Sequence, residues 1–125
     1  MTGPPSAPVV FLPGYFGKLD AGEDIVDLLA PDFTFSFLWA TDDGAQEFAG
    51  ALDDFLGYMG QRDPAGQRHH ISHAVREGPI ELVSGWTTRY GSPLGTFLFA
   101  VEVTDDGRAR RLYAARTEAF KGVPF

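Results

Sequence analysis

The chain is 125 residues long, and its 17 acidic and 10 basic side chains give a formal net charge of −7 at pH 7. An acidic surface repels the phosphate backbone of nucleic acids, so we expect no nucleic-acid partner. The chain contains no cysteine, which excludes thiol catalysis, thiolate zinc sites and iron–sulfur clusters. No stretch is apolar and long enough to span a bilayer, so no membrane partner is expected either.

The length predicts a single domain over residues 9–125, preceded by a flexible tail over residues 1–8. That tail is rich in Pro and Ser and lacks a basic region followed by an apolar core, so it is not a secretory signal and we expect a cytoplasmic protein. The 11 Phe, 4 Tyr and 2 Trp are many for a domain of this size. They predict either the walls of a cavity or an oligomer interface.

The first third of the chain predicts two short helices and a strand. Pro13 suits a first helical turn, which indicates a helix from about Pro13 to Leu19. A second helix begins at a cap, Asp24, and extends through Leu29, and Pro31–Asp32 ends it. From Phe33 to Trp39 aromatic residues alternate with smaller ones, a period of two that places four rings on one face of a strand.

The rest of the chain predicts one long helix and then strands. Apolar residues fall at helical spacing from Ala45 to Met59, with Asp43 as the N-cap and Gly60 at the end. Four strands follow at about residues 68–76, 80–90, 94–104 and 108–117, joined by turns rich in Gly, Pro and Asp. Helices first and an antiparallel meander last predict an α+β fold.

Three segments carry a family resemblance: Tyr15–Gly22, Leu28–Phe35, and Gly95–Val103 with the Asp106–Arg108 turn. With this element order, they resemble the nuclear transport factor 2-like superfamily, in particular the SnoaL-like group with its relatives among polyketide cyclases, ketosteroid isomerases and scytalone dehydratase. The resemblance implies a cone in which a curved antiparallel sheet wraps around the helices and encloses an apolar pocket. It also implies a homodimer through the outer sheet face, with Trp86 as a plausible anchor.

The resemblance assigns only part of the isomerase machinery to this chain. Tyr15 matches the phenol that donates to the developing enolate oxygen, with an ordinary packed aromatic residue of a short helix as the alternative. The position of the catalytic carboxylate is Phe37, and the position of the second acid is Phe99. Since phenylalanine neither accepts a proton nor donates a hydrogen bond, we do not expect that mechanism here.

Histidines are the leading candidates for proton transfer. His69 and His73 share one strand face with Ile71 and Val75, which predicts that both point inward. The resemblance places His69 where relatives carry a pocket histidine, and a neutral imidazole can give or take a proton near pH 7. A hydrogen-bonded wall residue without turnover is the alternative. A metal site would need a third ligand that no pattern supplies, so we expect neither metal nor cofactor.

The resemblance also implies roles for an acid, an arginine and a set of residues that line the pocket. Asp20 matches an acid near the histidines of scytalone dehydratase, with shaping the first turn as its alternative role. By register Arg116 points into the cone, where it could hold a carboxylate or enolate, or pair with Glu118 or Glu102. The residues expected to bind substrate are Phe35, Phe37, Trp39, Phe97, Phe99, Leu112 and Ala114.

These expectations favour a small-molecule enzyme that isomerises, cyclises or dehydrates an apolar substrate, such as a polycyclic one. His69 would be the general acid/base, helped by His73, with Tyr15 or Arg116 stabilising charge on oxygen. The alternative is a module of the same fold that binds a ligand or dimerises without catalysis. The two differ in whether a bound ligand is chemically changed.

Overall fold

The computed structural model of the chain describes residues 8–118, so most of the expected tail over residues 1–8 lies outside the described residues. The described elements, in chain order, are α1 (Phe11–Asp20), the single-turn 3₁₀ helix η1 (Val26–Leu28), β1 (Leu29–Thr41), β2 (Gly44–Ala51), α2 (Leu52–Met59), β3 (Gln67–Glu77), β4 (Ile80–Arg89), β5 (Ser92–Val103) and β6 (Ala109–Thr117). Within residues 8–118, no helix has the length and apolar character needed to cross a membrane.

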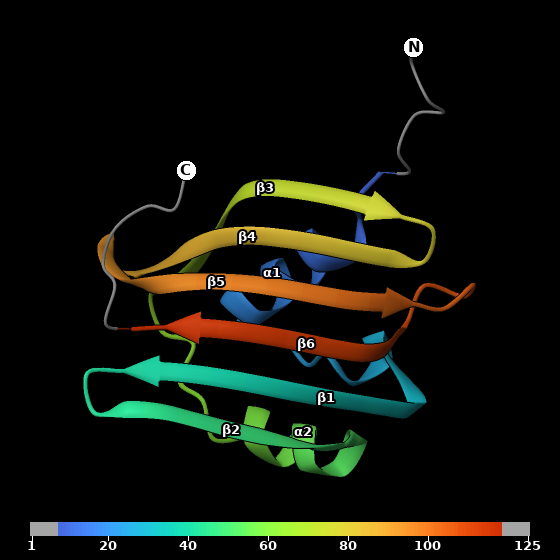
Figure 1. The fold of residues 1–125 in the computed structure, drawn as a ribbon, viewed down its shortest axis with the longest axis horizontal. Helices are drawn as coiled ribbons and strands as arrows, with labels where there is room; N and C mark the ends of the chain where they lie inside the picture. The colour runs from blue at the N-terminus through green and yellow to red at the C-terminus, as the bar shows by residue number, and fades with distance from the viewer. Residues whose placement is uncertain (1–7, 119–125) are drawn as a thin grey trace.

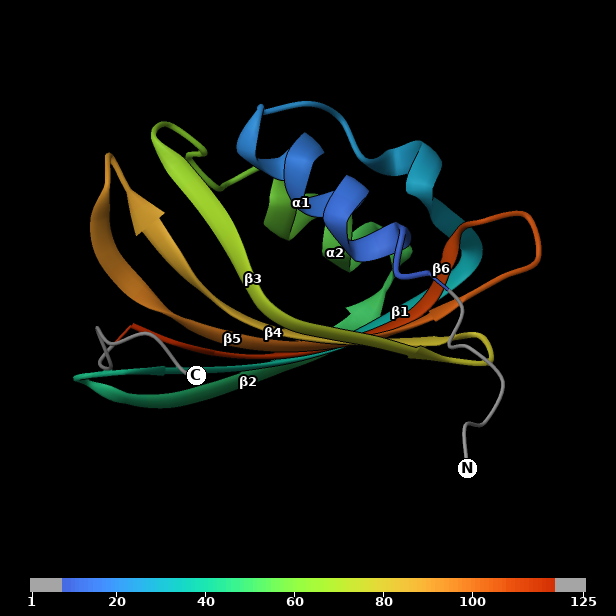
Figure 2. The ribbon, with the colours of Figure 1, turned by 90° about the horizontal axis from the view of Figure 1, so that it is seen from above.

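The six strands form one curved sheet in the order β2-β1-β6-β5-β4-β3 (Figure 1). Figure 2 shows that α1 and α2 both lie on its concave side. The expected meander of β3 to β6 is confirmed, and so is the α+β cone. One pairing was not expected: β1 lies parallel to β6, which makes the sheet mixed. The convex side is covered by no segment within residues 8–118 (Figure 2).

The alternation in β1 is confirmed. Phe33, Phe35 and Phe37 are 1%, 6% and 6% exposed and pack under the helices. The strand begins earlier than predicted, at Leu29, and its register with β6 shifts between Leu29 and Thr34. Pro31 lies in this irregular stretch, where a missing backbone N–H does the least damage to the ladder. The predicted second helix is therefore reduced to η1.

The predicted helix over Ala45–Met59 is wrong in its first half. Residues up to Ala51 form β2. The ring of Phe48 on this strand packs edge-on against Phe37 of β1, with ring centroids 5.3 Å apart. Helix α2 begins only at Leu52, and Asp54 accepts a hydrogen bond from the Ala51 N–H at 3.0 Å. Asp43 is thus a hairpin-turn residue and not the N-cap. Gly60 does end the helix, as predicted.

A bulge in β3 overturns the expectation that His73 points inward. The pairing with β4 shifts between Ile71 and His73, because Ser72 is inserted there and donates its hydroxyl to the Ser84 carbonyl at 3.1 Å. One extra residue reverses the faces of everything that follows it. His69 keeps its inward position, whereas His73 is exposed on the convex side.

A buried carboxylate attaches α1 to the sheet. Glu81 is 0% exposed on the concave side of β4. Its two oxygens accept hydrogen bonds from the N–H groups of Val10, Phe11 and Leu12 at 3.2, 2.9 and 2.9 Å, which are the groups that a helix N-terminus leaves without a partner inside the helix. Arg76 lies 3.4 Å away and supplies the opposite charge. This contact fixes the first turn of α1 against the sheet.

Candidate functional site

A small polar cavity of about 20 Å³ lies between the concave face of the sheet and the helices. Its walls combine five polar or charged side chains with apolar ones, and they come from most of the elements. They are Tyr15, Leu19, Phe37, Tyr58, Met59, Arg62, His69, Phe99 and Arg116. The sequence predictions of Tyr15, His69 and Arg116 as residues of one site therefore meet at this cavity.

His69 is held by Asp20 at the wall of this cavity. Its Nδ1 lies 2.6 Å from Oδ1 of Asp20, and its backbone N–H donates to Oδ2 of the same carboxylate at 2.8 Å. The ring of Phe16 stacks on the imidazole, with centroids 4.6 Å apart and planes within 2°. Position and orientation of the imidazole are thus fixed, and Nε2 is the ring nitrogen left to meet a substrate.

The charges of this pair follow from its environment. Burial lowers the pKa of His69, which the hydrogen bond to Asp20 only partly offsets. Burial raises the pKa of Asp20, but the hydrogen bonds from the side chain and backbone of His69 outweigh it and leave that pKa below its ordinary value. At neutral pH the pair is a carboxylate and a neutral imidazole. Nδ1 carries the proton of the imidazole and donates a hydrogen bond to Asp20. Nε2 is then the unprotonated nitrogen and can act as a base.

Tyr15 places a buried hydroxyl at the same cavity. Its side chain is 1% exposed and stacks on Phe11, with centroids 5.9 Å apart. Among residues 8–118 its hydroxyl has no hydrogen-bond partner. Burial raises the pKa of this phenol, so it remains a protonated donor at neutral pH. A buried donor of this kind is costly unless it is paired, and its pairing with a substrate oxygen would offset that cost.

Two guanidinium groups, of Arg62 and Arg116, complete the polar wall. Arg62 donates to the Leu19 carbonyl at 3.2 Å and to the side-chain oxygen of Gln67. Arg116 lies over the ring of Trp39, 5.9 Å from its centroid. Neither forms an ion pair with a described residue, and the anticipated partner Glu102 faces Arg111 instead. Burial lowers the pKa of Arg62, and the charge of Arg116 lowers it further, against the opposing effect of Tyr15.

The expected pocket walls are only partly walls of this cavity. Phe37 and Phe99 border it, whereas Phe35, Trp39, Phe97, Leu112 and Ala114 do not. Leu112 and Ala114 point inward as predicted but are packed in the core, 3% and 0% exposed. Most of the aromatic rings fill the cone by packing on one another, for example Phe35 on Phe55 with centroids 5.1 Å apart.

Sequence reasoning missed Tyr58 and Arg62. Tyr58 lies on the part of the predicted long helix that does form, and its place on the inner face was readable from helical spacing. Arg62 lies in the connection after α2, and no local pattern indicates that it turns inward. His73 belongs to the opposite face of the sheet and is not part of this site. For the same reason His69 and His73 cannot bind one metal ion together.

A larger surface hollow of about 550 Å³ adjoins the polar cavity. Three side chains, Leu19, Met59 and Arg62, line both spaces and so form the partition between them. The remaining lining of the hollow comes from the α1–η1 connection and the end of α2, and it comprises Gly22, Glu23, Asp24, Ile25, Val26, Leu56, Gly60 and Pro64.

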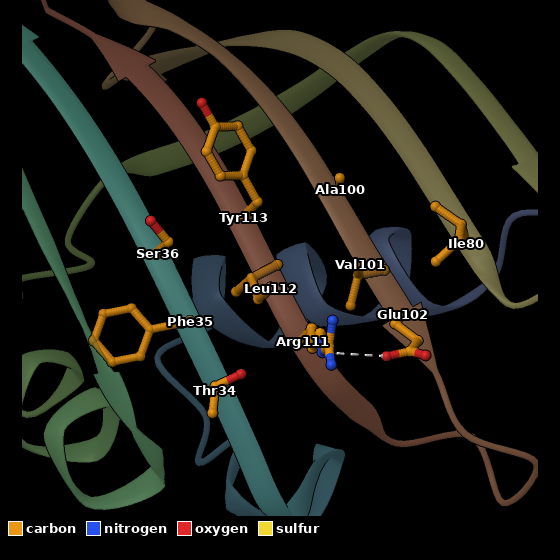
Figure 3. A pocket seen from close by; sticks show the side chains of 10 residues that line it. All are labelled: Thr34, Phe35, Ser36, Ile80, Ala100, Val101, Glu102, Arg111, Leu112 and Tyr113. Carbon is orange, nitrogen blue, oxygen red and sulfur yellow. Dashed lines mark ion pairs between the residues drawn. The ribbon is translucent and has the colours of Figure 1, made fainter.

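A separate groove of about 390 Å³ lies on the convex side of the sheet (Figure 3). Figure 3 shows Tyr113 and Ile80 along it, with Arg111 directed at Glu102, and α1 behind the sheet. The two charged groups are 3.8 Å apart. No histidine lines the groove, so it differs in chemistry from the polar cavity.

Acid should destabilise the fold through His69. Because its folded-state pKa lies below the ordinary 6.5, the unfolded chain takes up a proton more readily, and this contribution to stability is complete above pH 6.5 and is lost as the pH falls below it. Asp20 adds to the loss only in stronger acid, since its pKa lies below 3.8. Urea unfolding should show lower stability at about pH 5 than at about pH 7.5. An equal decline in the His69→Gln variant would contradict this assignment.

Comparison with solved structures shows which fold this is. A candidate ketosteroid isomerase of Kribbella flavida superposes with a TM-score of 0.61 at 22% identity, covering 92% of this chain and 81% of that chain. A candidate polyketide cyclase of Sinorhizobium meliloti has a TM-score of 0.58 at 17% identity, with coverages of 83% and 92%. A candidate isomerase of the SnoaL-like family from Agrobacterium tumefaciens has a TM-score of 0.56 at 12% identity, with coverages of 85% and 93%.

No protein-family profile matches the chain, and no curated protein matches its sequence. At identities this low the likeness extends to the fold and not to the activity.

Proposed function

We propose that this chain, which has the nuclear transport factor 2-like fold expected from its sequence, is a small-molecule enzyme that moves protons through His69. The observation that carries the proposal is the 2.6 Å contact between His69 and Asp20 beside the buried, unpartnered hydroxyl of Tyr15. Base, orienting acid and oxygen donor are the parts that isomerisation, cyclisation or dehydration of a carbonyl or hydroxyl compound requires.

The chemistry follows from the protonation states. Nε2 of His69 takes a proton from the carbon next to a carbonyl. The C–H electron pair forms a C=C bond, and the π pair of the C=O bond moves onto the oxygen to give an enolate. Tyr15 donates a hydrogen bond to that oxygen. Return of the proton to another carbon gives isomerisation, and its transfer to a departing hydroxyl gives dehydration with loss of water. Attack of the enolate carbon on a second carbonyl closes a ring, and the new alkoxide takes the proton from His69. Asp20 stabilises the imidazolium formed in between.

This arrangement explains how Phe37 and Phe99 are compatible with catalysis. Isomerases carry their carboxylate base at the position of Phe37, and in this chain an imidazole from β3 takes over the role of base. The two phenylalanine rings then become apolar walls, which suit the body of an apolar substrate. Among apolar substrates, polycyclic ones are the largest that we consider. The cavity by itself, at about 20 Å³, is small for them.

Exchange of carbon-bound hydrogen tests the proposal directly. A panel of cyclic ketones is incubated with the protein in D₂O, and proton NMR follows the signal of the hydrogen next to the carbonyl. Some of these compounds should gain deuterium at that carbon only when the protein is present. The His69→Gln variant should lose roughly a hundred- to ten-thousandfold of this rate. The His70→Gln variant is the matched control, because His70 is the next residue but stacks on Trp86 and bonds Thr88. Equal exchange by all three proteins would end the role of His69.

The second candidate is a ligand-binding or dimerisation module without catalysis, and the convex face favours it. This face exposes Val75, Leu82, Leu98 and Tyr113 by 43–49%. It also carries the Arg111–Glu102 ion pair. In a two-fold symmetric dimer through this face, the pair of one copy would lie opposite the same pair of the other copy. We propose that a second copy covers this face, a feature that is compatible with either function.

Dimerisation predicts a concentration-dependent mass. In analytical ultracentrifugation the wild-type chain should sediment as a dimer, and Leu98→Glu on β5 should shift it toward monomer by placing a charge at the centre of the face. Val26→Glu is the control, since Val26 is 38% exposed near the helices on the other side. A wild-type monomer at all concentrations would refute the dimer.

A further inference from the structure

The polar cavity has an excess of positive charge. Two guanidinium groups border it, whereas no carboxylate from residues 8–118 does. Asp20, whose charge acts on Arg62, gives both of its oxygens to His69. The partners of Arg62 are a carbonyl and an amide oxygen, which accept hydrogen bonds from it without neutralising its charge. Both arginines are half-buried, and removing a cation from water even in part is unfavourable unless an anion joins it.

The unpartnered hydroxyl of Tyr15 is a second and independent indication of a ligand. It is a hydrogen-bond donor directed at the cavity, with a side chain 99% removed from solvent. A donor and two cations around one space are complementary to oxygen atoms that carry negative charge. An aliphatic or aromatic hydrocarbon would leave all three unpaired.

The adjoining hollow provides room for the rest of such a ligand. The cavity alone, at about 20 Å³, is little larger than a water molecule needs, whereas the hollow of about 550 Å³ is within the usual range for small-molecule sites. Rotation of the Met59 and Arg62 side chains would join the two spaces. The hollow is lined on one side by Ile25, Val26 and Leu56, which suit an apolar body.

We propose that the ligand of this site is an apolar carboxylic acid, with its carboxylate held by Arg116 and Arg62 in the polar cavity and its apolar body in the hollow. The inference rests on the proposed function and specifies its substrate class, namely oxo or hydroxy acids. Tyr15 then donates to the oxo or hydroxyl oxygen next to the carboxylate, within reach of His69. Arg62 acts both as a ligand of the carboxylate and as the movable side chain at the entrance.

Calorimetric titration with a matched pair of probes tests this class. 1-Naphthoate and its neutral analogue 1-naphthamide have the same apolar body and differ in charge. Wild-type protein should bind naphthoate roughly ten- to a hundredfold more tightly than naphthamide, the range for a charge-assisted hydrogen bond. Equal affinities, or no detectable binding of naphthoate, would overturn the proposal.

Variants on a single strand separate the cavity from general surface charge. Arg116→Gln should abolish the preference for the acid, whereas Arg116→Lys should keep part of it by retaining the charge. Arg111→Gln is the matched control, because Arg111 lies on the same strand but points to the convex side with its side chain 77% exposed. An equal loss in Arg111→Gln would overturn the proposal. If Arg116→Gln does not fold, Arg116→Lys decides: a partial loss of the preference supports the site, and an unchanged preference overturns it.

The His69→Gln variant separates this inference from the proposed function. It should exchange no deuterium and still bind naphthoate more tightly than naphthamide, because the charge preference comes from the arginines and not from the neutral imidazole. Deuterium exchange by wild-type protein without a preference for the acid would overturn the substrate class and leave the function standing. A clear preference for the acid without exchange on any ketone or oxo acid would support the class of ligand and overturn the function.

Discussion

Replacing Asp20 with asparagine should lower turnover roughly a hundred- to ten-thousandfold while the chain still folds. In the wild-type chain the carboxylate accepts from both the Nδ1 proton and the backbone N–H of His69. An asparagine can keep the backbone contact through its oxygen, but its amide then donates to Nδ1. The proton of the imidazole moves to Nε2, and the nitrogen that faces the substrate can no longer accept one. Steady-state kinetics on any substrate found by deuterium exchange would measure the loss.

The pH profile distinguishes this positioning role from a merely structural one. In the wild type, kcat/KM should rise with pH to a plateau with an apparent pKa below 6.5, since the base is a neutral imidazole whose pKa burial lowers. In Asp20→Asn the pKa of His69 should fall further, because the carboxylate that raises it is gone. Near-normal kcat/KM in a folded Asp20→Asn protein would contradict the assignment of Asp20.

Replacing Glu81 with leucine should destabilise the fold by about 3–5 kcal/mol, the range found when one partner of a buried charged pair is removed. The carboxylate is 0% exposed and takes the N–H groups of Val10, Phe11 and Leu12. Leucine has a similar volume but leaves these donors without an acceptor, and it leaves Arg76 without its counter-charge. The midpoint of urea unfolding should fall accordingly.

Two further variants make this measurement specific. Glu81→Gln keeps one acceptor oxygen and should lose less stability than the leucine variant. Glu77→Gln changes an exposed acid at the end of β3 and should stay within about 0.5 kcal/mol of the wild type. A leucine variant as stable as the wild type would show that the start of α1 does not depend on this contact.

Much of the fold was predictable because its signals are local. The alternation from Phe33 to Trp39 repeats every second residue, and only an extended backbone places those rings on one face. Turns of Gly, Pro and Asp separated β3 to β6 at nearly their observed bounds. Of the site, Tyr15, Asp20 and His69 lie in segments whose ends were predicted well. The meeting of Tyr15 and His69 at one cavity, with Asp20 bound to His69, could therefore be anticipated.

Other features depend on contacts between distant segments. Residues 45–51 have the apolar spacing of a helix, but Phe48 gains more by packing on Phe37 across a hairpin, so the segment is a strand. The apolar pattern of β3 contains no mark of the bulge at Ser72, which only its pairing with β4 creates and which turns His73 outward.

The sequence alone therefore determined the α+β layout, the inward rings of β1 and the presence of a histidine, an acid and a phenol in the right segments. The tertiary structure alone decided which histidine meets the acid, that the aromatic rings fill the cone, and that Arg62 joins Arg116 beside Tyr15. The physical reason is that periodicity records which face of an element is apolar, whereas charge pairing and strand register are set by residues far away in the chain.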